Sequence, residues 1–149
     1  MYKLDVPQKN EYATLLEIWE CSVRATHYFL EKNDIEVFKK IIQEKDVFSQ
    51  VNLTCIRDIN NNILGFMGVT GASLEMLFVG SRSIGKGIGK ILLLHAINDL
   101  NITKVDVNEQ NEQALRFYEH FGFKVTSRSE LDGTGKPYPV LHMQLQRNP

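Results

Sequence analysis

The stretch Ile84–Lys90, I-G-K-G-I-G-K, has the residue types of a loop that holds phosphate groups. Its three glycines alternate with other residues between an apolar strand candidate and an apolar helix candidate. Glycine lets backbone N–H groups approach a phosphate closely, and a helix N-terminus favours anions. We therefore predict a phosphate cradle, with positive charge from Arg82, Lys86 and Lys90. The structural alternative is a glycine-rich turn that only begins a helix.

Two familiar phosphate-binding patterns fit this stretch less well. The dinucleotide pattern G-x-G-x-x-G fails because Lys90 follows Gly87 at the third glycine position. The P-loop pattern G-x-x-x-x-G-K-[ST] has Gly80, Gly85 and Lys86 in register, but Gly87 replaces the magnesium-binding hydroxyl. A small nucleotide-binding enzyme with this incomplete P-loop is one alternative, and it would bind ATP together with magnesium.

A second segment, Asn111–Phe123, reads N-E-Q-A-L-R-F-Y-E-H-F-G-F and predicts an amphipathic helix. Ala114, Phe117 and Tyr118 fall on one apolar face at helical spacing. The periodicity by itself therefore predicts that Tyr118 is a core residue.

Together the two segments resemble the GCN5-related N-acetyltransferase (GNAT) superfamily. Ile84–Gly89 is similar to its pyrophosphate loop, [QR]-x-x-G-x-[GA], and Asn111–Phe123 to its signature N-x-x-A-x-x-F-Y-x-x-x-G-F. Within the superfamily the chain resembles the bacterial YjaB-like acetyltransferases, which share the forms V-N-E-Q-N-E-Q-A, G-F-K-V-T and G-K-P-Y-P. Ile84 stands where Gln or Arg is usual, which removes a polar side chain but no backbone donor. The departure therefore concerns coenzyme affinity more than coenzyme identity.

The resemblance implies direct transfer of an acetyl group from acetyl-CoA to an amine, without a metal. It implies that backbone groups of the strand S-L-E-M-L-F-V bind the acetyl carbonyl and the pantetheine. The glycine-rich loop would hold the pyrophosphate, and Asn111 would contact the pantetheine arm. The expected cofactor-binding residues are Leu77, Phe78, Val79, Ile84, Gly85, Lys86, Gly87, Ile88, Gly89, Lys90, Asn111 and Phe117.

The resemblance also assigns catalytic roles to side chains. Tyr118 takes the position of the general acid, and a phenol can donate a proton to a departing thiolate. Two residues are candidates for the general base. His27 has a suitable intrinsic pKa, and strand alternation places Glu75 on the same face as Leu77 and Val79. The structural alternatives are a partnered histidine at a helix end and a solvated carboxylate.

For the acceptor site the resemblance indicates the end of the first helix, with Trp19, Arg24 and His27 as substrate-binding candidates. Tyr138 is expected to form one wall of the acceptor pocket, although its simplest role is to stiffen a turn. The acceptor would be a small-molecule amine or a protein amine, and a homodimer is compatible with the resemblance. A catalytically silent acyl-CoA-binding sensor is a further alternative of another functional class.

The elements that must position these residues follow from hydrophobic periodicity. We predict a strand near 2–6, a helix through 15–23, and a helix capped by Asn33 and Asp34. A hairpin over 52–70 and a strand over 73–79 follow. Then come a helix over 88–97, a strand over 102–108, a helix over 112–121, and strands over 124–130 and 138–145. This order predicts a mixed α/β sheet. The resemblance adds a mostly antiparallel GNAT sheet, splayed between strands 4 and 5, with about four helices.

Composition limits the other possibilities. With 149 residues, 43% of them hydrophobic, the chain is expected to form one domain over 1–149. A formal charge of −1 argues against nucleic acid or an anionic membrane as partner. Neither a signal peptide nor a membrane-spanning run is evident, so we expect a soluble, cytoplasmic protein. Cys21 and Cys55 suit neither a disulfide framework nor a zinc site and are expected to be buried thiols.

Overall fold

The structure, a computed structural model, describes residues 1–146. Its seven-stranded sheet has the order β1-β2-β3-β4-β5-β7-β6. The strands are β1 (Lys3–Asp5), β2 (Asn52–Arg57), β3 (Ile63–Thr70), β4 (Ser73–Val79), β5 (Lys104–Asn108), β6 (Phe123–Ser129) and β7 (Val140–Leu145). The α-helices are α1 (Tyr12–Thr26), α2 (Lys32–Glu44), α3 (Ile88–Asn98) and α4 (Glu112–His120). Short 3-10 helices η1 (Lys9–Glu11), η2 (Val47–Gln50) and η3 (Ser81–Ser83) connect them.

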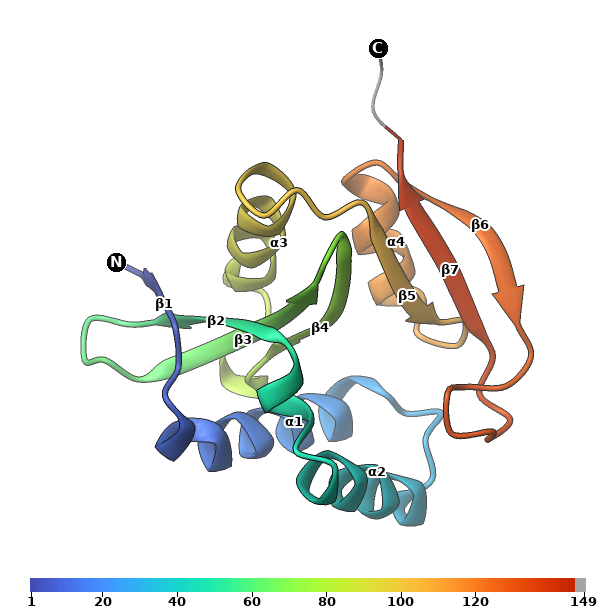
Figure 1. Ribbon diagram of the computed structural model, residues 1–149, viewed down its shortest axis with the longest axis horizontal. Helices are drawn as coiled ribbons and strands as arrows, with labels where there is room; N and C mark the ends of the chain where they lie inside the picture. The colour runs from blue at the N-terminus through green and yellow to red at the C-terminus, as the bar shows by residue number, and fades with distance from the viewer. Residues whose placement is uncertain (147–149) are drawn as a thin grey trace.

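The sheet separates two hydrophobic cores. In Figure 1, α1 and α2 lie below the sheet, and α3 and α4 lie above it. Leu15, Trp19 and Phe66 belong to the lower core, and Leu92 and Phe123 belong to the upper core. The predicted mixed α/β sheet is therefore confirmed, and the structure shows that helices cover both of its faces.

The sheet opens between β4 and β5. These two strands are parallel, and they pair only at Ser73 with Lys104 and at Leu74 with Val105. Beyond Leu74 the described part of the chain gives β4 no strand partner on that side. Backbone groups of a strand require partners, so the remainder of β4 offers free donors and acceptors to the gap. The predicted separation of strands 4 and 5 is confirmed.

A β-bulge at Glu75 changes which face the β4 side chains occupy. Gly68 of β3 pairs with Met76, whereas the next residue of β3 pairs with Leu74, so Glu75 is the extra residue. Leu74 and Leu77 consequently pack on the same core although they are three residues apart. Simple alternation placed Glu75 on the face of Leu77, and the bulge makes that prediction wrong.

Two other sequence expectations also need correction. The second helix begins at Lys32 with Glu31 at the N-cap position, so neither Asn33 nor Asp34 caps it. Cys55 is buried as expected, but Cys21 is exposed. Within residues 1–146, none of the helices combines the length and the apolar character that crossing a membrane requires.

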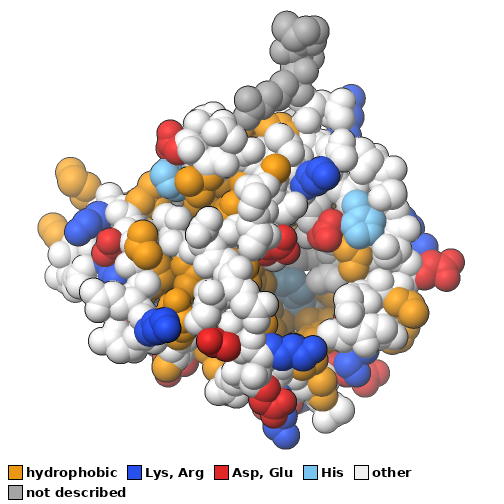
Figure 2. Space-filling model, viewed as in Figure 1, with side chains coloured by type: hydrophobic (Ala, Val, Ile, Leu, Met, Phe, Trp, Pro, Cys, Tyr) orange, Lys and Arg blue, Asp and Glu red, His pale blue; other side chains and the backbone are white. Residues whose placement is uncertain are grey.

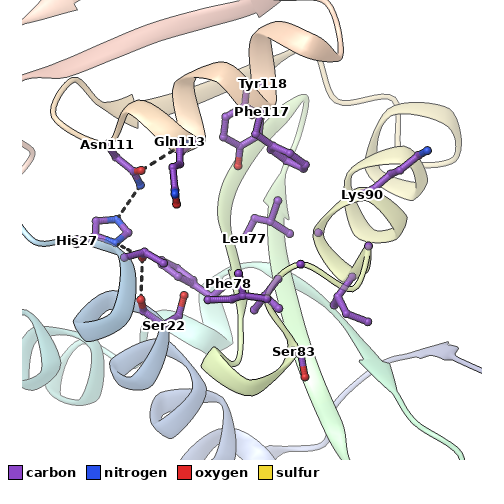
Figure 3. A pocket seen from close by; sticks show the side chains of 18 residues that line it. Ser22, His27, Leu77, Phe78, Ser83, Lys90, Asn111, Gln113, Phe117 and Tyr118 are labelled. Atoms are coloured by element: carbon purple, nitrogen blue, oxygen red, sulfur yellow. Dashed lines mark hydrogen bonds between the residues drawn. The ribbon is translucent and has the colours of Figure 1, made fainter.

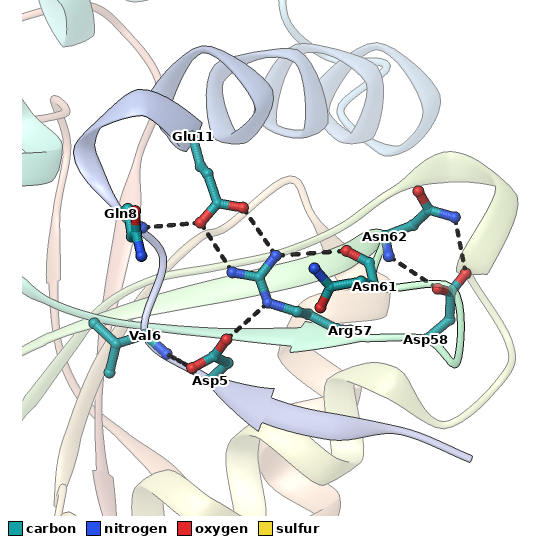
Figure 4. Close-up of polar contacts among 8 residues, drawn as sticks. All are labelled: Asp5, Val6, Gln8, Glu11, Arg57, Asp58, Asn61 and Asn62. Atoms are coloured by element: carbon teal, nitrogen blue, oxygen red, sulfur yellow. Dashed lines mark hydrogen bonds and ion pairs between the residues drawn. The ribbon is translucent and has the colours of Figure 1, made fainter.

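A buried arginine fixes the start of α1. Arg57 is 5% exposed as a residue. Its guanidinium donates to Glu11 through two N–H groups, at 2.8 and 2.9 Å, and to Asp5 at 2.9 Å (Figure 4). Glu11 is the N-cap residue of α1. Hydrogen bonds from Arg57 and from the Gln8 backbone lower the pKa of Glu11 to about 2. This cluster joins β1, η1 and β2, and it anchors the helix whose far end carries His27.

Candidate active site

A cleft of about 370 Å³ lies beside the end of β4 that has no β5 partner, and Figure 3 shows its lining side chains. Leu77, Phe78 and Val79 of β4 line it, together with the glycine-rich loop, the start of α3, one face of α4 and the end of α1. Of the predicted cofactor-binding residues, only Lys86 is not among its lining residues. The sequence reasoning missed several others: Ser22, Thr26, Ser83, Gln113 and Ala114.

The glycine-rich loop has the backbone conformation that only glycine adopts readily. Gly85 and Gly87 have φ values of 84° and 81°, and Gly87 is the N-cap residue of α3. A Cβ atom at either position would have no neighbour within 4 Å. Steric crowding inside the protein therefore does not require glycine at these positions. The positive φ values do favour glycine there. The open space above them allows a ligand to approach the backbone closely.

Helix α4 brings Tyr118 into the cleft. Asn111 caps this helix by accepting a hydrogen bond from the backbone N–H of Ala114 at 3.2 Å. The Tyr118 ring packs edge-on against Phe117 and Phe123, with centroids 5.2 and 5.7 Å apart. Figure 3 shows its hydroxyl directed into the cleft. Burial raises the pKa of this phenol, so Tyr118 holds its proton at neutral pH. The ring is a core residue, and its hydroxyl faces the site.

His27 lies directly after α1, next to Asn111 at the start of α4 (Figure 3). Its Nδ1 is 2.8 Å from the Thr26 hydroxyl, and its Nε2 is 3.4 Å from the Asn111 amide nitrogen. Burial lowers its pKa from 6.5 to about 4. The residue is therefore neutral throughout the physiological range, and its pKa in the fold lies below the intrinsic value that made it a candidate base.

Glu75 lies away from the cleft. It lines a neighbouring cavity of about 210 Å³ that also includes His27, Asp106 and Tyr118. Its Oε1 accepts a hydrogen bond of 2.6 Å from the Thr70 hydroxyl. The carboxylate is exposed, as the solvated alternative supposed.

A third cavity, of about 260 Å³, lies between α1, α2 and the loop before β7. We call it the aromatic chamber, and its lining residues are Trp19, Val23, His27, Leu30, Phe38, Ile41, Ile42, Phe78, Asn108, Asp132 and Tyr138. On the face that carries α2 and β7, Figure 2 shows a hollow with hydrophobic and histidine side chains inside it, acidic side chains above it and a basic side chain below it. The chamber brings together three predicted substrate residues, Trp19, His27 and Tyr138.

Arg24, the fourth predicted substrate residue, does not line the chamber. Its guanidinium pairs with Glu20 at 2.8 Å and with Glu36 at 2.7 Å. These bonds join the outer surfaces of α1 and α2, so Arg24 is an exposed, ion-paired residue of the helix surface.

The loop before β7 is held against α2 by a polar clamp formed by Asp34, Lys136 and Tyr138. The Tyr138 hydroxyl donates a short hydrogen bond to Asp34, and the Lys136 ammonium lies 2.9 Å from the same carboxylate. The hydroxyl also accepts a hydrogen bond of 3.3 Å from the backbone N–H of Glu31. Hydrogen bonds from Tyr138 and Lys136 lower the pKa of Asp34. These residues are about a hundred positions apart in the chain, and no local pattern indicates that they meet.

His27 belongs to all three cavities. The cleft reaches it from the side of the glycine-rich loop, and the aromatic chamber reaches it from the side of α2. Among residues 1–146, no three His, Cys, Asp or Glu side chains gather as a metal site would require.

Comparisons with known proteins agree with this geometry. The family model for the acetyltransferase (GNAT) domain matches residues 25–146. The chain is 40% identical to the peptidyl-lysine N-acetyltransferase YjaB of Salmonella typhimurium over 90% of its length and 91% of that protein. The solution structure of apo YjaB from Escherichia coli is 33% identical and superposes with a TM-score of 0.88 over 99% of both chains. The PaiA N-acetyltransferase of Thermoplasma acidophilum, solved with coenzyme A, shares the fold at 22% identity, with a TM-score of 0.76 over 99% of both chains.

Proposed function

The chain belongs to the acetyltransferase (GNAT) family, and from that premise we propose that it acetylates the ε-amine of lysine in a protein or peptide, with acetyl-CoA as donor. One observation carries this proposal. Tyr118 and His27, a proton donor and a neutral imidazole, both line a cleft beside the part of β4 that has no partner on the β5 side. The named relative supports the choice of acceptor, because it is a peptidyl-lysine N-acetyltransferase.

The cleft suits acetyl-CoA in shape and in chemistry. The positive-φ glycines and the N-terminus of α3 would hold the pyrophosphate, with Lys90 as a lining cation. The backbone N–H groups of Leu77 to Val79 that face the gap would bind the pantetheine and the thioester oxygen. Preorganised donors of this kind stabilise the negative charge that develops on that oxygen. None of these contacts requires magnesium.

The proton transfers follow from the two side chains. As the amine attacks the thioester carbon, a C–N bond forms and the nitrogen becomes acidic. His27, which is neutral, takes that proton at Nε2. The tetrahedral adduct then breaks its C–S bond, and the sulfur receives the Tyr118 proton. Solvent afterwards takes up the proton from His27 and restores the one on Tyr118.

The aromatic chamber suits the acceptor. A lysine side chain has an apolar stem and a polar end, and such side chains bury the stem while the charged end stays in a polar setting. Trp19, Phe38 and Tyr138 provide the apolar walls, and His27 stands where the chamber meets the cleft. In this proposal Glu75 lines the neighbouring cavity of about 210 Å³ and is not the general base.

Two measurements test the proposal. Calorimetry should detect coenzyme A binding without added metal, and mass spectrometry should detect acetyl transfer from acetyl-CoA to a lysine peptide. A matched peptide with acetyl-lysine at that position is the control. Binding of ATP with magnesium in place of coenzyme A would support the P-loop alternative. Coenzyme A binding without transfer to any lysine peptide would support the silent sensor.

A further inference from the structure

We propose that Thr26 is a positioning residue that, together with Asn111, holds His27 in one neutral tautomer, with the proton on Nδ1 and the lone pair on Nε2. The inference extends the proposed function, in which Nε2 receives the proton of the attacking amine. It concerns which nitrogen of a neutral ring carries hydrogen, and two separate hydrogen-bond chains determine the answer.

The first chain starts at α4. The Ala114 backbone N–H can only donate, and it lies 3.2 Å from Asn111 Oδ1. The other end of the Asn111 amide is therefore the NH₂ group, and it lies 3.4 Å from His27 Nε2. Two donors cannot face each other in a hydrogen bond, so Nε2 must be the acceptor and carries no proton.

The second chain starts at α1. The Ser22 backbone carbonyl can only accept, and it lies 2.7 Å from the Thr26 hydroxyl. The single Thr26 hydroxyl proton is used in that bond. The oxygen can then only accept from His27 Nδ1, at 2.8 Å, so Nδ1 must be protonated. Both chains reach the same tautomer from opposite sides of the ring.

Neutral partners, rather than charges, set this tautomer. The titratable side chains that line the three cavities around His27 are Glu75, Lys90, Asp106, Tyr118, Asp132 and Tyr138. None of them contributes to the lowered pKa of His27, whose cause is burial alone. His142 differs, because its Nδ1 is 2.7 Å from the Asp106 carboxylate. A hydroxyl partner orients the imidazole without favouring its protonated form. The bond from Asn111 to Nε2 is long, at 3.4 Å, and the attacking amine must displace it before Nε2 receives a proton.

Thr26→Val and Thr26→Ser form a matched pair for the test. Valine keeps the β-branched shape and loses the hydroxyl, whereas serine keeps the hydroxyl. Imidazole nitrogen NMR of the full chain, with the His27 signals assigned by their loss in His27→Gln, reports the tautomer directly. We expect the parent and Thr26→Ser to carry the proton on Nδ1, and Thr26→Val to shift it towards Nε2. Turnover of a lysine peptide should fall roughly tenfold in Thr26→Val and recover in Thr26→Ser, with the KM for acetyl-CoA little changed.

Asn111→Asp provides an opposing variant. Aspartate can still cap α4, but it presents a carboxylate oxygen to Nε2 in place of an NH₂ group. It should therefore move the His27 proton to Nε2 or protonate the ring fully. Thermal unfolding and circular dichroism check that each variant is folded.

The outcomes separate this inference from the proposed function. A parent His27 with its proton on Nε2 would overturn the inference without any activity measurement. A tautomer shift in Thr26→Val with unchanged turnover would overturn the positioning role. Failure of the parent to acetylate any lysine peptide, with the Nδ1 proton in place, would contradict the proposed function while supporting the fixed tautomer.

Discussion

The cleft and the aromatic chamber meet at His27 but are built in different ways. Two short segments of chain, 77–90 and 111–118, provide most of the residues that line the cleft. The groups that we propose bind the ligand there are mainly backbone groups. Residues of α1, α2 and the loop before β7 line the chamber, and their side chains form its surface. The polar clamp formed by Asp34, Lys136 and Tyr138 holds the most distant of these walls in place.

This difference predicts how each site responds to change. A site made of backbone groups should tolerate side-chain replacement except where a special φ or a reacting atom is involved. A site made of side chains from distant segments should respond to any change that releases one wall. Substitutions in the cleft should therefore alter coenzyme binding or chemistry, and substitutions in the clamp should alter acceptor binding alone.

The largest effect is expected for Tyr118→Phe, which keeps the ring packing and removes the hydroxyl directed into the cleft. Turnover should fall by roughly 10²–10⁴-fold if this proton transfer limits the rate. Coenzyme A affinity and thermal stability should change little. Steady-state kinetics with calorimetry measures both, and acyl donors with more acidic thiols should show a smaller defect. Parental turnover under conditions where chemistry limits the rate would make Tyr118 a core residue only.

His27, which the two sites share, should make the stability of the protein depend on pH. The pKa of His27 is lowered from 6.5 to about 4. Between these two pH values the unfolded chain binds a proton at His27 that the folded chain does not bind. The free energy of unfolding should therefore decrease as the pH falls from 6.5 towards 4, by about 3 kcal/mol from this residue. His27→Gln should lack that decrease in urea unfolding measured between pH 7 and 4.5.

Glu11→Gln is the control for that experiment. Glu11 has its pKa lowered from 4.5 to about 2, so its stabilising contribution is present above pH 4.5 and is lost as the pH falls towards 2. This variant should be less stable than the parent but keep the same pH dependence between 7 and 4.5. Equal slopes for His27→Gln and the parent would show that His27 is not held neutral by burial.

Gly87→Val tests the backbone character of the cleft. A β-branched residue at a φ of 81° is strained, so the loop must change its conformation. Coenzyme A affinity should weaken roughly tenfold in calorimetry. Gly71→Val is the matched control, because Gly71 also has a positive φ, 56°, and open surroundings, but lies in the β3–β4 turn. Unaltered affinity in a folded Gly87→Val would mean that this loop does not hold the pyrophosphate.

Asp34→Asn should give the smallest effect and the most selective one. It weakens the bonds to Lys136 and Tyr138 and so releases the loop that closes the chamber. The KM for a lysine peptide should rise about threefold to tenfold, because exchanging a charge-assisted hydrogen bond for a neutral one costs about 1 kcal/mol. The affinity for coenzyme A should stay at the parental value. Arg24→Gln, which breaks ion pairs outside the chamber, should change neither. A joint loss of both affinities in Asp34→Asn would show that the two sites are not independent.

The sequence by itself determined the elements and the cleft in which we propose that acetyl-CoA binds. Hydrophobic periodicity predicted the strands and helices because each depends on neighbours a few residues away. The three glycines and the Asn111 signature predicted the cleft for the same reason, since their geometry is local. The position of Tyr118 in the cleft was predictable from its place in that signature, although the helix periodicity indicated only a core residue.

Tertiary structure alone decided the rest. The bulge at Glu75 depends on pairing between β3 and β4, and it moved a predicted base away from the face of Leu77. The lowered pKa of His27 depends on burial between separate elements. The clamp joins Asp34 to Tyr138 across most of the chain. Such contacts arise only when distant segments pack, because each side chain has its partner in space rather than along the sequence.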